Sequence, residues 1–337
     1  MSVQPKVITV TLNPSLDRTM ITHFFAIGYH NETRETTRLD PAGRGVSISR
    51  ALHSLGIPTH AIVLLARDST GRAYQALLAE EQFPITILRR EGTTRSNIII
   101  KDTGHNNETH LWEASKGVTH DDLQMVADKL RELIEPGDRV VFAGSLPTDT
   151  SPDTYAWLTD VAQRDGALVV INAGGGQALR ASLKARPRLI YLTQLQAEGI
   201  FNFPVRTPED ALYCARQLRE QGAERVLIAR RDANSALLVT DEGTWMVDLP
   251  EVVDGGTRSG QAEAMIAGYL AGRLKERSID EALELGAAAA AYTVSQVGNE
   301  FGTLRDVQAF AGQVNVTPVE EQPGESEGKA AEDAEIG

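Results

Sequence analysis

Short apolar runs and helical apolar stripes alternate along most of the chain. Each apolar run has the length of a strand and is rich in Val, Ile, Leu and Ala, as expected of strands buried on both faces. These runs lie at residues 7–12, 61–65, 139–143, 167–171, 189–192 and 226–229. The segments between them have the apolar spacing of helices. This order predicts an α/β fold with a mostly parallel sheet that is covered by helices on both faces.

Two of the helical segments also carry end signals. The apolar stripe at 46–55 is followed by Gly56, and glycine commonly ends a helix in the left-handed conformation. The stripe at 123–134 is preceded by Thr119 and Asp122, which have the spacing of a capping box. Both signals support the helical interpretation.

Four segments interrupt the alternation because they favour strands but are partly polar. They lie at 18–25, 33–39, 83–88 and 97–101. We expect them to form a small separate β-sheet, with strands drawn from about 18–40 and 83–112. Such a sheet would suit a lid that excludes water during chemistry. Two copies of the chain could also pair through the exposed edges of such lids as a homodimer.

The last part of the chain differs in composition from the rest. Residues 317–337 are rich in Glu, Gly, Pro and Ala and lack apolar periodicity, so we predict a disordered acidic tail. From residue 320 onward, seven acidic residues stand against one lysine, which accounts for six of the net charge of -13. The predicted folded domain therefore spans 1–316.

Charge and cysteine content narrow the function classes. A net charge of -13 argues against nucleic acid or an anionic membrane as a partner. No apolar run approaches the roughly 18 residues that a membrane span needs, and the polar start of the chain does not resemble a signal peptide. Cys214 is the single cysteine, so an internal disulfide is impossible. A reduced, cytoplasmic compartment is expected.

Four motifs carry candidate chemistry. They read TLNPSLD at 11–17, AGRGVSISRAL at 42–52, TRSNIII at 94–100 and GSLP at 144–147. The glycines of the second motif allow close approach of a ligand, and the helix that follows favours anions at its N-terminus. This motif also half-matches a dinucleotide fingerprint, but Ile48 stands where the third glycine should be. A Rossmann oxidoreductase is therefore a weak third interpretation.

Together these motifs resemble the ribokinase/PfkB family of carbohydrate kinases. The resemblance runs from about residue 7 to 310 and points to the branch that contains 1-phosphofructokinase and tagatose-6-phosphate kinase. It implies a ribokinase-like fold, a sugar-phosphate substrate, and ATP with Mg²⁺ as the phosphoryl donor. It implies no metal site made by the protein alone. The residues that it implies for the sugar phosphate are Asp17, Gly43, Arg44, Ser47, Arg95, Asn97 and Ser145.

Each of these residues also has a plain structural explanation. The resemblance puts Asp17 at the end of the first strand, where a carboxylate accepts hydrogen bonds from sugar hydroxyls, but Asp after Asn-Pro is also a common turn. Arg44 and Arg95 would form a cationic clamp on the substrate's phosphate, yet an arginine on an edge strand also deters aggregation. Ser145 meets the sugar phosphate or simply caps a helix.

The C-terminal half departs from the family's motifs. The family's GAGD becomes Gly260-Gln261-Ala262-Glu263 when the following residues are aligned without gaps. Glu263 then replaces the catalytic aspartate as general base, and Gly260 begins the anion pocket. An alternative register puts Gln261 in that place and leaves no base. Ala262 adds a Cβ where the family has glycine, and we expect this to penalise a positive φ there.

The segments that contact the nucleotide in the family are also altered. The family's KPNxxE resembles residues 192–197, where Gln194 stands in the loop. The family's SLGxxGALLV resembles 229–239, where Arg230 and Arg231 replace small residues. These arginines would either bind ATP phosphates or fill the space. Gln194, Arg230, Arg231 and Gly260 are therefore the nucleotide-binding candidates.

Two functions follow from this uneven pattern. The first is ATP-dependent phosphorylation of a sugar phosphate, such as fructose 1-phosphate or tagatose 6-phosphate, with catalysis by positioning and electrostatics. The alternative is a catalytically weak or inactive sugar-phosphate binder on the same fold, acting as a sensor or a partner subunit.

Overall fold

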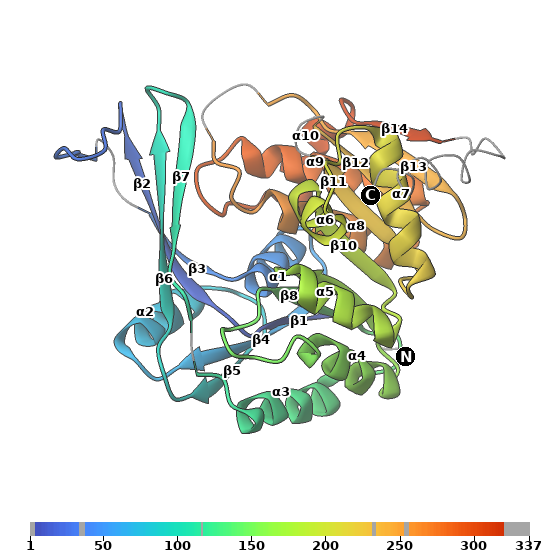
Figure 1. The fold of residues 1–337 in the computed structure, drawn as a ribbon, viewed down its shortest axis with the longest axis horizontal. Coiled ribbons are helices and arrows are strands. Elements are labelled where there is room, and N and C mark those ends of the chain that lie inside the picture. Colours follow the sequence, from blue (N-terminus) through green and yellow to red (C-terminus); the bar gives the residue numbers. More distant parts are fainter. Residues whose placement is uncertain (1–3, 34–37, 116, 231–233, 253–255, 320–337) are drawn as a thin grey trace, which may run out of the picture.

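The computed structural model describes residues 4–33, 38–115, 117–230, 234–252 and 256–319. Within these residues two sheets form, one large and one small (Figure 1). None of the described helices combines the length and the hydropathy that a bilayer crossing requires.

The large sheet has the strand order β14-β13-β12-β11-β10-β9-β8-β1-β4-β5. All neighbours from β11 to β5 run parallel, and β12, β13 and β14 add antiparallel strands at one edge. The mostly parallel sheet predicted from the sequence is confirmed. Its strands are β1 (Val7–Thr11), β4 (Thr59–Ala66), β5 (Ile85–Arg90), β8 (Arg139–Gly144), β9 (Leu168–Ala173), β10 (Leu189–Thr193), β11 (Val226–Arg230), β12 (Ser235–Val239), β13 (Thr244–Asp248) and β14 (Asn315–Pro318).

Helices cover both faces of this sheet. They are α1 (Arg44–Ser54), α2 (Ser69–Leu78), α3 (His120–Leu133), α4 (Thr154–Arg164), α5 (Gly176–Ser182), α6 (Gln194–Phe201), α7 (Pro208–Glu220), α8 (Gln261–Leu274), α9 (Ile279–Val294) and α10 (Leu304–Ala311), with a 3₁₀ turn at Leu183–Ala185. Helices α3 to α7 pack on one face, and α1, α8, α9 and α10 pack on the other. Each fully buried Leu or Ile in these layers contributes about 1.5–3 kcal/mol, so the layers hold the sheet rigid beneath the cleft.

Local signals in the sequence fix where several helices begin and end. Thr119 accepts a hydrogen bond from the amide of Asp122, and the Asp122 carboxylate accepts one in return from the Thr119 amide, which confirms the predicted capping box of α3. Gly56 follows α1 with a φ of 71°, as its sequence position predicted. The two helices α8 and α9 approach closely, and a Cβ on Gly268 would lie 2.6 Å from the Leu285 carbonyl oxygen.

The small sheet has the order β3-β2-β6-β7 and projects from the large one as a lid (Figure 1). Its strands are β2 (Ser15–Thr22), β3 (Arg38–Ala42), β6 (Arg95–Asp102) and β7 (Asn107–Trp112). Strand β2 pairs in parallel with β6, in a register that sets Asp17 opposite Asn97. The separate small sheet predicted from the sequence is therefore confirmed.

Three details of the sequence prediction are wrong. Residues 83–88 do not belong to the lid, because β5 pairs with β4 in the large sheet and packs Ile85 and Ile87 against the cluster under α2. Asp17 does not end the first strand, since β1 stops at Thr11 and Asp17 lies in the lid strand β2. The tail does not start at residue 317, because Thr317 and Pro318 pair with β13. The rest of the predicted tail, 320–337, lies outside the described residues, as do 34–37 of the predicted strand at 33–39.

Candidate active site

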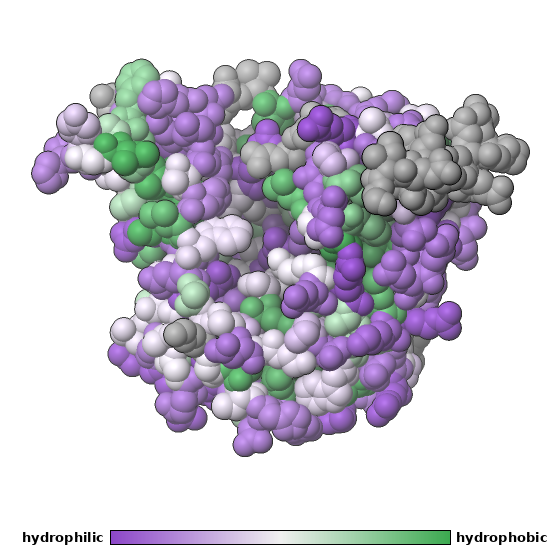
Figure 2. Space-filling view, viewed as in Figure 1, coloured by the Kyte–Doolittle hydropathy of each residue, from purple (hydrophilic) through white to green (hydrophobic). Residues whose placement is uncertain are grey.

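A cavity of about 390 Å³ opens between the lid and the large sheet. Figure 2 shows the surface hollowed there. The last residues of β1, β8, β10 and β11 or their neighbours line it, so it lies at the carboxyl edge of the sheet, where open α/β folds bind ligands. Eleven residues predicted from the sequence line this one cavity: Asp17, Gly43, Arg44, Ser47, Arg95, Asn97, Ser145, Gln194, Arg230, Gly260 and Glu263. Arg231 lies outside the described residues.

The lid contributes a hydrogen-bonded carboxylate. Asp17 Oδ1 accepts hydrogen bonds from Ser15 Oγ at 2.7 Å and from Asn97 Nδ2 at 2.9 Å. Burial raises the pKa of Asp17, while these two hydrogen bonds and the nearby Arg95 charge act in the opposite direction. Asn97 Oδ1 is buried and has no partner within the described residues. The cluster therefore presents both a carboxylate and an unused acceptor to a polar ligand.

Arg95 begins strand β6 and lies beside this cluster. Its Nη2 donates to the Asn13 carbonyl oxygen at 3.3 Å, and its Nε is buried without a partner in the described part of the chain. Burial lowers the pKa of Arg95, Asp17 raises it, and Arg44 lowers it. The two arginines of the predicted clamp are thus close enough to repel each other. An anion bound between them would relieve that repulsion.

The glycine loop sets the position of Arg44. Gly43 has a φ of 136°, and a Cβ there would lie 2.6 Å from Thr11 Cγ2. A Cβ on Gly45 would lie 2.4 Å from Thr11 Oγ1, which accepts a hydrogen bond from the Val46 amide. Both glycines are required because α1 starts against the end of β1. Arg44 is consequently the first residue of α1, at the floor of the cavity.

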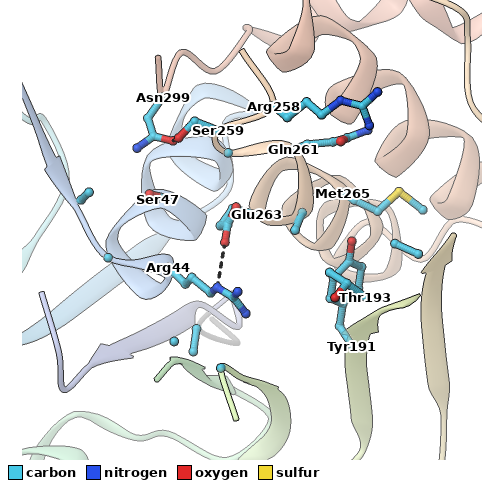
Figure 3. Close-up of a pocket in the computed structure, with 18 of the residues that line it drawn as sticks. Arg44, Ser47, Tyr191, Thr193, Arg258, Ser259, Gln261, Glu263, Met265 and Asn299 are labelled. Carbon is cyan, nitrogen blue, oxygen red and sulfur yellow. Dashed lines mark hydrogen bonds and ion pairs between the residues drawn. The ribbon is translucent and has the colours of Figure 1, made fainter. Parts of the chain in front are cut away.

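Arg44 points across the cavity to Glu263 (Figure 3). Arg44 Nε lies 3.5 Å from Glu263 Oε1, and Arg44 Nη1 is buried with no partner among the described residues. The Glu263 side chain is 11% exposed and comes from the first turn of α8. A carboxylate therefore lies in the cleft, as the alignment without gaps predicted. Gln261 also lines the cavity, as the first residue of α8, two positions before Glu263.

The N-terminus of α8 differs from one expectation. Gly260 precedes the helix with a φ of 84°, and no side chain caps the helix there. Ala262 has no positive φ, because it is already a helical residue. The expected penalty at Ala262 is therefore wrong. The helix start leaves amide donors and a positive dipole end facing the cavity, which suits a phosphoryl group.

Comparison with known proteins identifies this arrangement. The family model described as "pfkB family carbohydrate kinase" matches residues 10–304. The chain belongs to the pfkB family of carbohydrate kinases. It is 29% identical to 1-phosphofructokinase of Bacillus subtilis, over 92% of this chain and 99% of that protein. It is 27% identical to 1-phosphofructokinase of Haemophilus influenzae, over 93% of this chain and 99% of that protein.

The fold agrees with that membership. A crystal structure of phosphofructokinase-2 from Escherichia coli in complex with fructose-6-phosphate superposes with a TM-score of 0.81. The match covers 92% of this chain and 99% of that one, at 24% sequence identity. The ribokinase-like fold predicted from the sequence is confirmed, and the protein is a sugar kinase of the pfkB family. The Rossmann interpretation is wrong, because the strand before the glycine loop, β3, lies antiparallel in the lid.

On the nucleotide side, the candidate residues of this pfkB-family chain mostly contact the protein itself. Gln194 Nε2 donates to Glu198 Oε1 at 3.3 Å. Arg230 Nη1 donates to Ser235 Oγ at 3.3 Å and its Nη2 to the Arg206 carbonyl oxygen at 3.1 Å, while its Nε is buried without a partner in the described residues. Two of the three guanidinium nitrogens of Arg230 thus already donate within the protein, which favours the space-filling explanation over a phosphate contact.

The cavity also has walls that sequence reasoning missed. Asn13 donates to Ser145 Oγ at 3.1 Å, and its place in the first motif could have marked it. His110 and Trp112 of β7, Arg258 before α8, and Asn299 also line the cavity, but no motif singled them out. Asn299 accepts a hydrogen bond from Ser259 at 2.9 Å. These residues reach the site through the lid and the C-terminal loop, and only the fold brings them there.

The donor set of the cleft bears on Mg²⁺. Among the described residues, no three His, Cys, Asp or Glu side chains cluster as a metal site. Asp17 and Glu263 are the carboxylates that line the cavity. This set fits a Mg²⁺ ion that keeps its waters and is carried by nucleotide phosphates, not one caged by the protein.

Proposed function

We propose that this kinase transfers the γ-phosphoryl group of ATP to a hydroxyl of a hexose monophosphate. Fructose 1-phosphate is the first candidate acceptor and tagatose 6-phosphate the second. The observation that carries the proposal is the arrangement of one cleft. On one wall, Arg44 and Arg95 each have a buried nitrogen without a partner in the described residues. On the other wall, the Glu263 carboxylate lies at an uncapped helix N-terminus. The names of the curated relatives, 1-phosphofructokinase, support the choice of acceptor.

In this proposal the substrate binds to one side of the cleft, the sugar wall, which carries Asp17, Arg44, Arg95 and Asn97. Arg44 and Arg95 bind the phosphate that the sugar already carries, because paired guanidinium groups match a phosphomonoester. Asp17 and Asn97 hydrogen-bond the sugar hydroxyls. Gly43, Ser47 and Ser145 line the rest of the surface that contacts the sugar phosphate. The lid then shields the acceptor hydroxyl from water.

Glu263 is the proposed general base. It takes the proton of the acceptor hydroxyl, the hydroxyl oxygen forms the new bond to the γ-phosphorus, and the bond from that phosphorus to the β-bridging oxygen breaks. Gly260 and the first amides of α8 stabilise the charge on the transferring group. Since Arg44 lies 3.5 Å from Glu263, a bound sugar phosphate would draw Arg44 away and release the carboxylate.

Mg²⁺ enters this proposal with ATP. It would supply positive charge that offsets the negative charge of the nucleotide's phosphates. Gln194 and Arg230 would border the nucleotide, Gln194 at the start of α6 and Arg230 at the end of β11.

A substrate screen tests the proposal. ATP and Mg²⁺ are incubated with fructose 1-phosphate, fructose 6-phosphate, tagatose 6-phosphate and unphosphorylated fructose, and ADP release is followed alongside ³¹P NMR of the sugar product. We expect turnover with a monophosphate and little with fructose. Tight binding of a sugar phosphate by calorimetry, with no ADP above the blank, would instead support the binding protein that transfers nothing.

We also propose that two copies pair through their lids. Strand β7 is an edge strand, and Leu111 and Trp112 on it are 54% and 69% exposed. Exposed apolar edge strands commonly mark an interface. Sedimentation equilibrium should give a dimer for the wild type and for Met125→Lys on α3, and a monomer for Leu111→Lys. A monomeric wild type would contradict this pairing.

A further inference from the structure

Four arginines converge at the opposite edge of the large sheet, away from the cleft. Arg139 is the first residue of β8, Arg188 and Arg225 directly precede β10 and β11, and Arg273 lies in the last turn of α8. They line a second cavity of about 90 Å³, together with apolar residues and Tyr269. The backbone of Arg139 bonds to Lys6, so this edge lies by the N-terminus, which Figure 1 marks on the side away from the lid.

The charges around this cavity do not balance. Arg188 forms an ion pair with Glu224, and Arg225 forms one with Glu242 at 2.6 Å. Asp241 adds a negative field at Arg225. Within the part of the chain that the structure describes, Arg273 donates a hydrogen bond only to the Arg277 carbonyl oxygen, at 2.6 Å. Within the described residues, no carboxylate lies within ion-pair distance of Arg139 or Arg273.

Burial makes this imbalance costly. Arg225 is 7% exposed, and its Nε is buried with no partner among the described residues. Burial lowers the pKa of Arg139, and Arg273, Arg188 and Arg225 lower it further. Like charges held this close destabilise the fold unless an anion joins them.

Packing alone does not explain the cluster. Arginine stems often cover apolar surface while their charged heads point into solvent, and the carboxylate partners of Arg188 and Arg225 fit that account. Arg139 and Arg273 lack such partners and still turn toward the same cavity. The chain as a whole carries a net charge of -13, so these four arginines are not part of a general cationic excess.

We propose that this cavity binds the phosphate group of a small molecule, at a site separate from the catalytic cleft. Planar guanidinium groups from several directions match the oxygens of a phosphate. The volume of about 90 Å³ is several times the ~10–15 Å³ that one water needs, yet far smaller than the 390 Å³ cleft. The site therefore takes a phosphate group and leaves any larger part of the ligand outside.

Calorimetry at low ionic strength tests the proposal with inorganic phosphate as the probe. The wild type should show two sites, because the clamp in the cleft binds phosphate as well. Arg139→Gln should weaken one site by about tenfold or more, the effect of losing a charge-assisted hydrogen bond. Arg95→Gln should weaken the other. The control Arg131→Gln, an exposed arginine on α3 paired with Asp128, should keep both sites.

Two further arms sharpen the result. Methyl phosphate should bind the Arg139 site as well as phosphate does if the natural ligand is a phosphomonoester, and much more weakly if it is free phosphate. Thermal melts give a second readout, since phosphate should raise the Tm of Arg95→Gln but not of Arg95→Gln with Arg139→Gln. Without phosphate, Arg139→Gln should melt no lower than the wild type, because one of four like charges is gone.

Arg273→Gln provides a second variant should Arg139→Gln fail to fold. Phosphate binding that is equal in the wild type and in both variants would overturn the proposal. None of these measurements uses ATP or a sugar, so their outcome is independent of the proposed kinase reaction.

Discussion

The two walls of the cleft differ in how their polar groups are satisfied. On the sugar wall, Arg44 Nη1, Arg95 Nε and Asn97 Oδ1 are buried without partners in the described residues. On the nucleotide wall, which Gln194 and Arg230 line, Gln194 bonds to Glu198, and Arg230 bonds to Ser235 and to the Arg206 carbonyl. Only Arg230 Nε among these described side chains is buried without a partner. The sugar wall has three buried hydrogen-bonding atoms without a partner, whereas most side-chain groups named on the nucleotide wall already have one.

This difference bears on what each wall is built for. A buried polar group without a partner costs about 1–3 kcal/mol, and a bound ligand that pairs with these three atoms would offset that cost. The sugar wall is therefore shaped for a charged, hydrogen-bonding substrate. The nucleotide wall relies more on backbone and shape, and it includes the start of α8. Substitutions on each wall should have different consequences.

Glu263→Gln should have the largest effect, because it removes the proposed base while keeping the size of the side chain. We expect kcat to fall by about 10²–10⁴-fold in the ADP-release assay. Sugar-phosphate binding should remain or tighten, since Arg44 loses its carboxylate partner.

The matched control is Glu209→Gln, which alters a first-turn glutamate of α7 outside the cleft. It should leave kcat within about twofold of the wild type. Unchanged turnover in Glu263→Gln would mean that another group is the base and that α8 does not supply it.

Arg95→Gln should produce the next largest effect, on substrate binding. The lost charge-assisted contact, about 1.5–3 kcal/mol, should raise the KM for the sugar phosphate by roughly 10- to 100-fold and leave the KM for ATP nearly unchanged. Arg18→Gln, on the exposed face of the same lid sheet, is the control. An equal rise in both KM values would mean that Arg95 orders the whole lid and does not act on the sugar wall alone.

Much of the fold could be predicted because its signals are local. The buried strands of the parallel sheet appeared as apolar runs, and the caps of α1 and α3 were visible at Gly56 and Thr119. Strand β3 was harder, because it contains Asp40 and Pro41, which disfavour a strand. It exists as an edge strand, where a missing amide donor is tolerated.

The site was predictable only where a motif marked it. Asp17, Arg44 and Arg95 lie in short motifs, and the cavity unites them. The pairing of Arg44 with Glu263 joins residues 219 positions apart, and no local pattern reveals such a contact. The same holds for β5, whose membership of the large sheet depends on the open edge of β4 and not on its own residues.

Arg230→Met tests the nucleotide wall and should have a smaller effect on catalysis. The methionine keeps much of the packing but loses the hydrogen bonds to Ser235 and the Arg206 carbonyl. We expect the KM for ATP to change less than about threefold and the free energy of unfolding to drop by about 1–2 kcal/mol in urea. A tenfold rise in that KM would show that Arg230 contacts ATP, and the two walls would then be alike.

Asp17→Asn should have the smallest effect, a change in stability that tests whether the buried charge of Asp17 destabilises the fold. Burial raises the pKa of Asp17, so the folded state disfavours the ionised carboxylate. Above the raised pKa of the folded state, the carboxylate is ionised in both folded and unfolded chains, and the fold bears the cost of the buried charge. As the pH falls toward 4, the folded state takes up the proton first and that cost disappears. Asp17→Asn should therefore raise the Tm at pH 7, by about 1–3 °C, and the gain should shrink toward pH 4.

The same variant should weaken sugar-phosphate binding, since asparagine replaces an acceptor for two hydroxyls. The control Asp160→Asn, on the outward side of α4, should change neither the Tm profile nor binding. A Tm gain that is equal at both pH values would mean that the buried charge is not the cause. In that case Asp17 would not contribute an unfavourable buried charge to the sugar wall, and only Arg44, Arg95 and Asn97 would distinguish that wall from the one opposite.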